Sequence, residues 1–468
     1  MIHTDHSARP LIAKTLAQAG GDSSQAHKTA IVLGGLSPHH NFAWTFAGNF
    51  VYGVCQWAVI VVIAKMTPPA AVGQFALGLA VTAPILIFAY QGLRELQATD
   101  ARQQFEFHQY LRFRLLSGTL ALIAICALTK VLAYPPVVIV VGISKALESI
   151  CDLMYGKYQQ CERMDWIAIS MMLRGIFSVI AVAVLLHATH LIEWGAAGLI
   201  IANAVVLALY DWRQPAWLFH SVKTDDLHAH PLTSSSARVP HSSLRITTRN
   251  TTYCLAMLGL PLGLAQMLNS FSVNIPRYLL DRHAGEASLG IFAAIMYLIV
   301  AGRTVIGALA QSCVVRLARF YANGDGHAFK SLLFKQLVLA LGLGAAGIIF
   351  SVIWGAPFLR LIYRPEYADH TAVLFLAMAT AAINYLAEFT GTALIAARWI
   401  RVQPLILGMC VVVAWMSCAL LIPQYGILGA CWGALLTGAF QLGFYVCALA
   451  YAFYRAGWHR KGIIGRAA

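Results

Sequence analysis

The chain has 468 residues, of which 59% are hydrophobic and only 11% are charged. Soluble domains carry about 25% charged residues, so this composition excludes an ordinary soluble protein. The net charge of +14 does not indicate nucleic-acid binding, because the basic residues lie mainly between apolar runs, where they orient a membrane protein and meet anionic lipid. Apolar runs of about 20 residues recur along the chain, which predicts an all-α polytopic membrane protein rather than a barrel of short alternating strands.

A polar stretch at 213–249 divides the chain into two halves of similar length. It is rich in proline, serine, histidine and basic residues and has no long apolar run. We therefore expect a disordered cytoplasmic tail at 1–40, a first lobe at 41–212, a cytoplasmic linker at 213–249, a second lobe at 250–455 and a cytoplasmic tail at 456–468. The leading segment lacks the pattern of a secretory signal.

Hydropathy predicts twelve membrane-spanning helices, six in each half. The first six are expected at 41–64, 72–90, 115–133, 137–155, 167–186 and 192–210. The second six are expected at 252–275, 289–312, 332–354, 371–397, 404–422 and 427–454.

The distribution of Lys and Arg predicts the orientation. With the N-terminus inside, 24 basic residues fall on the cytoplasmic side and 6, including Arg277, fall outside. Cytoplasmic loops carry the excess of basic residues in membrane proteins, so both termini and the linker are expected in the cytoplasm.

Short motifs recur in the two halves in the same order. Gly73-Gln-Phe-Ala opens the second helix, and Gly290-Ile-Phe-Ala opens the eighth helix 217 residues later. Gly195-Ala-Ala-Gly and Gly426-Ile-Leu-Gly open the sixth and twelfth helices. Six helices per half is an even number, so a duplication gives a parallel repeat with its pseudo-two-fold axis along the membrane normal. Two such lobes would flank a central cavity.

Polar residues form a stripe on the first and seventh expected helices. Spacings of three or four place them on one helical face, and polar groups in spans usually face a bundle interior or a watery cavity. The cavity candidates are Asn49, Gln56, Gln266 and Asn274. Gln266 follows Asn49 by the same 217 residues, which favours a cavity, although hydrogen bonds between helices are the structural alternative.

Basic residues within or beside the spans predict a cationic cavity. Lys145, Arg174 and Arg303 lie inside expected spans, and Arg277 lies next to one. A guanidinium group donates in a planar fork that suits phosphate, so the cavity fits an anionic cargo.

Three acidic residues are candidates for ion coupling. Glu388 lies inside the 371–397 helix, where a carboxyl group must be protonated or paired, as coupling to protons or sodium ions requires. Glu148 and Asp152 share a helical face with Lys145, with which Glu148 can pair locally. The alternatives are a structural hydrogen bond for Glu388 and a closed ion-pair network for the other three residues.

Motifs of catalytic chemistry are missing from the sequence. It contains no G-x-x-x-x-G-K-[ST], no H-E-x-x-H and no G-x-S-x-G pattern, so we expect no ATP hydrolysis, no catalytic residues, no metal site and no cofactor. The chain is expected to be a transporter rather than an enzyme.

Several stretches resemble one family of membrane transporters. They are 41–49 (NFAWTFAGN), 73–84 (GQFALGLAVTAP), Leu93-Arg94 with 98–100 (ATD), 160–164 (QCERM), 275–278 (IPRY), 289–293 (LGIFA) and Tyr297. They are similar to Wzx-like polysaccharide and O-antigen flippases of the multidrug/oligosaccharidyl-lipid/polysaccharide (MOP) exporter superfamily.

The resemblance implies a V-shaped fold of two lobes in the bacterial inner membrane. Such a protein would move undecaprenyl-diphosphate-linked oligosaccharide from the cytoplasmic to the periplasmic leaflet for O-antigen, capsule or exopolysaccharide synthesis. Its partners would be membrane lipids, the lipid-linked cargo and other polysaccharide assembly proteins. Arg94, Arg277 and Arg303 are the positions that the resemblance marks as cargo contacts.

Two other functions compete with this hypothesis. A multidrug/cation antiporter of the same superfamily would share the fold, but its cationic cargo suits an anionic or aromatic cavity. A membrane-embedded glycan polymerase would need a sizeable loop on the outer side, and the expected outer loops are short.

Overall fold

The structure, a computed structural model, describes residues 38–100, 104–212, 248–399 and 402–455. The tails expected at 1–40 and 456–468 and the linker expected at 213–249 lie almost entirely outside these residues. The described part of the chain consists of helices and short connections. The helices are α3 (Pro38–Met66), α4 (Pro69–Tyr90), α5 (Leu93–Thr99), α6 (Phe107–Val131), α7 (Val137–Gln160), α8 (Met164–Thr189), α9 (Ile192–Val206), η1 (Leu207–Asp211), α10 (Thr248–Ala322), α11 (Gly326–Ile362), η4 (Pro365–His370), α12 (Thr371–Ala396), α13 (Gln403–Tyr425) and α14 (Ile427–Arg455).

The twelve expected spans all coincide with helices, and α10 contains two of them. This helix runs from Thr248 to Ala322 and is broken at Gly285, whose φ of 79° is not helical. The expected end of the seventh span at residue 275 is wrong, because the helix continues through Pro276 to the break. Membrane helices tolerate proline when neighbouring groups satisfy the freed backbone. Arg277 is therefore part of a helix rather than of an outer loop.

Ten helical segments of the described residues are long and apolar enough to cross a membrane. Helix α7 is not among them, because Lys145, Glu148 and Asp152 interrupt its apolar sequence. It nevertheless packs among the spans, against α4, α6 and α9. The chain is thus a multi-pass membrane protein in which one helix brings several charges into the interior.

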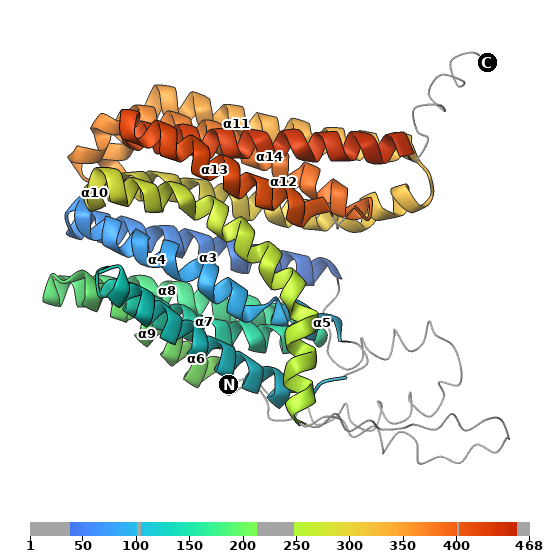
Figure 1. Cartoon of the computed structure of the whole chain (residues 1–468), viewed down its shortest axis with the longest axis horizontal. Helices are drawn as coiled ribbons and strands as arrows, with labels where there is room; N and C mark the ends of the chain where they lie inside the picture. The colour runs from blue at the N-terminus through green and yellow to red at the C-terminus, as the bar shows by residue number, and fades with distance from the viewer. Residues whose placement is uncertain (1–37, 101–103, 213–247, 400–401, 456–468) are drawn as a thin grey trace.

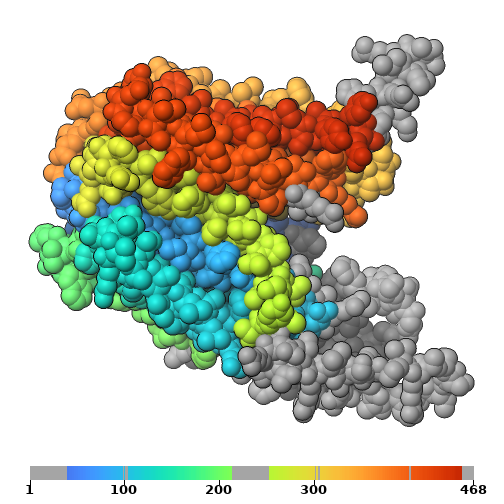
Figure 2. Space-filling view, in the orientation of Figure 1, coloured from blue at the N-terminus to red at the C-terminus, as the bar shows by residue number. Residues whose placement is uncertain are grey.

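The helices form two lobes that make a V (Figure 1). The first lobe contains α3 to α9, and the second contains α11 to α14 and most of α10. The lobes meet near the turn between α3 and α4 and the break in α10, at the left of Figure 1. They diverge toward the other end, where α3 and α10 begin and α14 ends, and Figure 2 shows a gap between them there. These ends are called the closed end and the open end.

Two glycines allow the lobes to touch at the closed end. A Cβ atom on Gly73 of α4 would overlap the carbonyl oxygen of Glu286, and a Cβ atom on Gly290 would overlap the carbonyl oxygen of Pro69. Glu286 follows Pro69 by 217 residues, and Gly290 follows Gly73 by the same number. The two contacts are therefore the same contact with the lobes exchanged, as a pseudo-two-fold axis requires. This reciprocity agrees with the parallel repeat predicted from the sequence.

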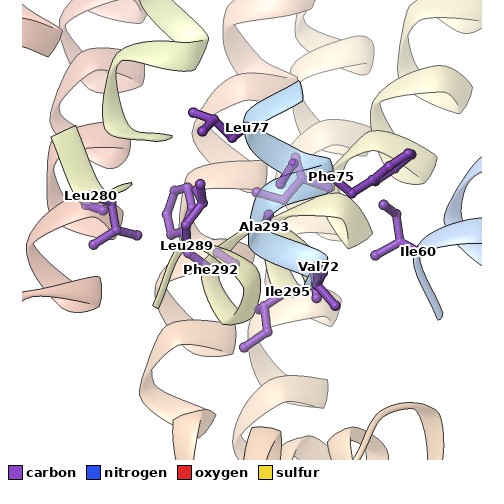
Figure 3. Close-up of a cluster of buried hydrophobic side chains, with 14 of the residues drawn as sticks. Ile60, Val72, Phe75, Leu77, Leu280, Leu289, Phe292, Ala293 and Ile295 are labelled. Carbon is purple, nitrogen blue, oxygen red and sulfur yellow. The ribbon is translucent and has the colours of Figure 1, made fainter. Parts of the chain in front are cut away.

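Apolar side chains fill the closed end, and a few hydrogen bonds cross it. Val72 and Phe75 of α4 pack with Leu289, Phe292 and other residues of α10 in the large buried cluster (Figure 3). Their burial supplies the main favourable free energy of the contact.

Tyr363, in the connection after α11, joins both lobes at this end. Its hydroxyl donates to the Ala294 carbonyl at 2.8 Å and accepts from Trp57 Nε1 at 3.1 Å. Burial raises the pKa of Tyr363 to about 12, so the hydroxyl keeps the proton that it donates. A further bond joins Gln74 Nε2 to Glu286 Oε2 at 2.8 Å.

Candidate functional site

A cavity of about 540 Å³ lies between α3, α4, α7, α8 and α10. We call it the cationic pocket. The charged residues that line it are Arg94, Lys145, Glu148, Asp152, Arg174 and Arg277. The structure therefore brings together four of the five basic residues predicted to bind cargo, together with two of the three acidic residues predicted for ion coupling.

Glu148 is held in place by two neighbours. Its Oε2 lies 2.7 Å from Lys145 Nζ, and its Oε1 accepts a hydrogen bond from the Tyr52 hydroxyl at 2.6 Å. The local pair expected from the i, i+3 spacing is present. The carboxylate compensates the charge of Lys145, and this pair adds no net charge to the cationic pocket.

Asp152 forms a second, separate ion-pair group. Its Oδ1 lies 3.0 Å from Arg94 Nη1, and its Oδ2 lies 3.9 Å from Arg114 Nη2. Arg114 is only 1% exposed, and its guanidinium lies 4.5 Å from the ring centroid of Tyr90. Arg114 directly precedes the span expected at 115–133, so its position in the sequence predicts a loop charge rather than this buried site.

Arg174 has no carboxylate within ion-pair distance among the described residues. Its side chain is 3% exposed and stacks 5.2 Å from the Tyr52 ring and 5.4 Å from the Tyr155 ring. Its Nε and Nη1 atoms have no hydrogen-bond partner in the described structure. Buried donors without acceptors are costly, and these two lie on a residue that lines a cavity.

Arg277 is the second basic residue of this pocket outside the described ion pairs. Its Nη1 donates to Asn274 Oδ1, a neutral acceptor that also lines the pocket. Since Lys145 and Arg94 are paired, Arg174 and Arg277 give the cationic pocket its excess positive charge. Two guanidinium groups in a half-buried cavity suit an anion with oxygen atoms on more than one centre.

Arg303 lies outside the cationic pocket, in a second cavity of about 430 Å³ formed by α10, α12, α13 and α14. The prediction that it would join the other basic residues is wrong. Its Nε lies 3.7 Å from Glu388 Oε2, and the two side chains are 48% and 31% exposed. The neighbours of this pair across the cavity are mainly amides, so we call the cavity the amide pocket. Its amide residues are Gln266, Asn269, Gln311, Asn384, Gln403 and Gln441.

A smaller cavity of about 330 Å³ connects the two pockets. It shares Ile87 and Asn274 with the cationic pocket, and Gln266, Asn269 and Arg303 with the amide pocket. A ligand could therefore contact both pockets at once along α10.

Of the two candidate residues on the polar stripe of α3, Asn49 lines a cavity and Gln56 does not line those described above. Asn49 lines a further cavity of about 650 Å³ together with Phe42, Phe46, Arg303 and Glu388. Its amide donates to the Thr45 carbonyl at 2.7 Å. Gln56 is not among the described residues that line these four cavities. On α10, in contrast, Gln266 and Asn274 both face cavities, as expected.

No protein-family model matches the chain. A curated relative, the capsular polysaccharide biosynthesis protein CapF of Staphylococcus aureus, is 25% identical over 395 residues, which cover 83% of this chain and 93% of CapF.

Several solved structures share the fold. An inward-facing multidrug resistance MATE family transporter of the MOP superfamily matches with a TM-score of 0.60 and 13% identity, over 92% of this chain and 97% of that one. A Vibrio cholerae MATE transporter, VcmN, has a TM-score of 0.57 and 14% identity over 89% and 96%. A MOP superfamily transporter from Pyrococcus furiosus, described as having a binding pocket of reverse polarity, has a TM-score of 0.53 and 14% identity over 89% and 94%.

These likenesses agree with the resemblance drawn from the sequence motifs. The two lobes, the spanning helices and the matching structures show the fold, while the low identities leave the cargo open. The chain is therefore a multi-pass membrane protein with the fold of the MOP superfamily transporters.

Proposed function

We propose that this protein is a flippase for lipid-linked oligosaccharides. It would carry undecaprenyl-diphosphate-linked glycan from the inner to the outer leaflet of the bacterial inner membrane, for the synthesis of a cell-surface polysaccharide. The observation that carries this proposal is the excess positive charge of the cationic pocket, provided by Arg174 and Arg277.

The charge of the cargo matches that of the pocket. A diphosphate esterified at both ends keeps one negative charge on each phosphate, and each phosphate offers free oxygens to a guanidinium fork. Arg174 lines the pocket, and a rearrangement of its buried side chain on binding would bring its unpaired Nε and Nη1 donors to such oxygens. Binding would also offset the cost of burying those donors without partners.

The relative CapF supports a cargo for polysaccharide synthesis, because its name refers to capsular polysaccharide biosynthesis. The MATE structures support only the fold, since their identity to this chain is 13% to 14%. A cationic drug would be repelled by Arg174 and Arg277. The aromatic rings of Tyr52 and Tyr155, which would otherwise attract a cation, already stack with Arg174.

The orientation and the energy source belong to the same proposal. The excess of Lys and Arg favours an orientation with both termini and the open end in the cytoplasm, in which the described conformation would receive cargo from the inner leaflet. Opening at the closed end would then release it outward. A proton or sodium gradient would drive the cycle through Glu388, which is loosely paired with Arg303 at 3.7 Å.

Translocation in proteoliposomes tests the proposal. A short-chain diphosphate-linked oligosaccharide is placed in the outer leaflet, and its protection from an external glycosidase is followed. Protein-dependent protection is expected for the native chain and for Arg360→Ala, an exposed arginine outside the pockets. Arg277→Ala should slow protection about tenfold, as expected for a lost charge-assisted contact.

Two results would contradict the proposal. The first is no protection above that of empty liposomes while a cationic dye is still exported against a proton gradient, which identifies a multidrug antiporter. The second is chain growth of the glycan by the purified protein, which identifies a polymerase.

A further inference from the structure

The cavity has two chemically different parts, and the proposed contacts with the cargo use only one of them. The cationic pocket lies between the first lobe and α10, and it carries the excess charge. The amide pocket lies in the second lobe, and the only charged residues among its described lining are Arg303 and Glu388, which form an ion pair. Its net charge is therefore zero.

The amides of this pocket are not used to hold the protein together. Gln266, Asn269 and Asn384 have no hydrogen bond to protein from their side chains in the residues that the structure describes. Gln403 makes one long bond, from Nε2 to the Gly391 carbonyl at 3.4 Å, and Gln441 Nε2 donates to the Tyr445 hydroxyl at 3.1 Å. Unpaired amides within a membrane protein are costly unless water or a ligand satisfies them.

The backbone makes room for these polar groups. A Cβ atom on Gly438 of α14 would lie 2.8 Å from Asn384 Oδ1, and a Cβ atom on Gly391 of α12 would lie 2.8 Å from Cε2 of Tyr445. Both contacts are closer than real Cβ contacts. The two glycines therefore let an amide and a phenol occupy the space between α12 and α14.

Amide groups suit one class of ligand. Each carries two donor hydrogens and an acceptor oxygen, and a sugar hydroxyl is likewise both donor and acceptor. A pocket without net charge has no preference for an ion, whereas several amides and a phenol can satisfy a neutral molecule rich in hydroxyl groups.

We infer that the amide pocket binds the glycan of the cargo while the cationic pocket binds its diphosphate. This inference rests on the proposed function. The connecting cavity lined by Asn269, Asn274 and Arg303 joins the two pockets, so the sugars attached to a diphosphate in the cationic pocket would extend directly into the amide pocket. The amides would then select neutral, hydroxyl-rich glycans.

The test compares ligands that share the lipid and a diphosphate esterified at both ends, and that differ in the glycan. One probe is farnesyl diphosphate capped with a methyl ester, so that its charge equals that of the others, and it is called farnesyl diphosphate below. The others are farnesyl diphosphates carrying neutral disaccharides or trisaccharides of hexose and N-acetylhexosamine. Their dissociation constants are measured with the full-length protein in nanodiscs. The ratio of the two constants, called the glycan gain, reports the contribution of the sugars alone.

The double variant Asn269→Leu/Asn384→Leu should reduce the glycan gain about tenfold, because two neutral hydrogen-bonding groups contribute about that factor. Its affinity for farnesyl diphosphate should stay unchanged. Asn323→Leu, which removes an exposed amide outside the pockets, should change neither value. If the double variant does not elute as a folded protein, Gln266→Met/Gln441→Met provides the same comparison with side chains of similar length.

The outcomes separate the two proposals. Farnesyl diphosphate that does not bind, or that binds independently of Arg277, would overturn the proposed function and this inference with it. Farnesyl diphosphate that binds, with no glycan gain for any sugar tried, would overturn only the inference. Amide variants that keep the full gain, or that weaken both ligands equally, would also overturn it.

Discussion

The two lobes share one architecture, but their pockets differ in charge. Each places a glutamate from its fourth spanning helix in its pocket, Glu148 on α7 and Glu388 on α12. Glu148 has Lys145 at 2.7 Å and Tyr52 at 2.6 Å, whereas Glu388 has Arg303 at 3.7 Å. The first glutamate therefore has two close partners, whereas the second has one more distant partner and lines two cavities.

The difference shows which parts of a duplicated fold stay symmetric. At the closed end, Gly73 and Gly290 make the same contact from opposite lobes, because both lobes need it to meet. In the pockets the side chains have diverged. The cationic pocket, between the first lobe and α10, has an excess of positive charge, whereas the amide pocket of the second lobe displays neutral amides. We attribute the symmetric part to the motion and the asymmetric part to the two ends of the cargo.

Replacing Arg174, the buried arginine without a carboxylate partner among the described residues, should have the largest effect on binding. Arg174→Leu should weaken binding of farnesyl diphosphate about 100-fold, because charge-assisted hydrogen bonds contribute about 1.5–3 kcal/mol each. The melting temperature should not fall, since the variant also removes buried donors without acceptors. Arg174→Lys keeps the charge without the planar fork and should bind with intermediate affinity. Native affinity in Arg174→Leu would remove this residue from the site.

The symmetric contact predicts equal effects from the two lobes. Gly73→Val and Gly290→Val should each shift the conformational equilibrium about thirtyfold toward a state in which the lobes separate at the closed end. The reason is that overpacking costs about 2 kcal/mol. The measurement is maleimide labelling of Leu289→Cys, a buried position, in a chain whose ten native cysteines have been replaced. Gly118→Val is the control, because a Cβ atom there meets no other atom within 4 Å. Markedly unequal rates for the two variants would contradict the reciprocity.

Most of the fold was predictable because each span is marked locally. An apolar run of about 20 residues is sufficient evidence for a membrane helix, and the glycine motifs at 73 and 290 revealed the repeat. The end of the seventh helix was misjudged because Pro276, Arg277 and Asp281 together resemble a loop. In the structure Arg277 faces a cavity, where its charge is tolerated.

The site was predictable only where one residue carried the signal. Lys145 and Arg174 stood out because a charge inside a span needs a reason. The pairing of Arg303 with Glu388 joins two helices distant in sequence, and no local pattern contains it. Asn269 and Gln441 were missed because a single amide in an apolar helix is usually a packing hydrogen bond. Only the packing of α10 against α12 and α14 shows that they share a cavity.

Glu388, the more weakly paired of the two glutamates, should control ion coupling. A pH difference of one unit corresponds to about 1.4 kcal/mol, so a carrier coupled to one proton accumulates cargo about tenfold. Glu388→Gln should abolish this accumulation while transport down the cargo gradient continues, and Glu148→Gln should leave coupling intact. The measurement is cargo protection in proteoliposomes with imposed proton or sodium gradients. Unchanged gradient dependence in Glu388→Gln would assign coupling to another group.

The smallest predicted effect is a gain rather than a loss of affinity, and it concerns Asp152. Asp152 compensates Arg94 at 3.0 Å on the edge of the cationic pocket, so Asp152→Asn adds one unit of positive charge to it. Because the two side chains are 31% and 37% exposed, solvent screens the gain, and diphosphate binding should tighten only about threefold. Stability should fall, because the buried Arg114 loses its compensating carboxylate and keeps only its stacking on Tyr90. The measurement is the dissociation constant of farnesyl diphosphate at low and high salt, and the gain should shrink as salt rises. Weaker binding in Asp152→Asn would mean that Asp152 positions Arg94 for the cargo rather than competing with it.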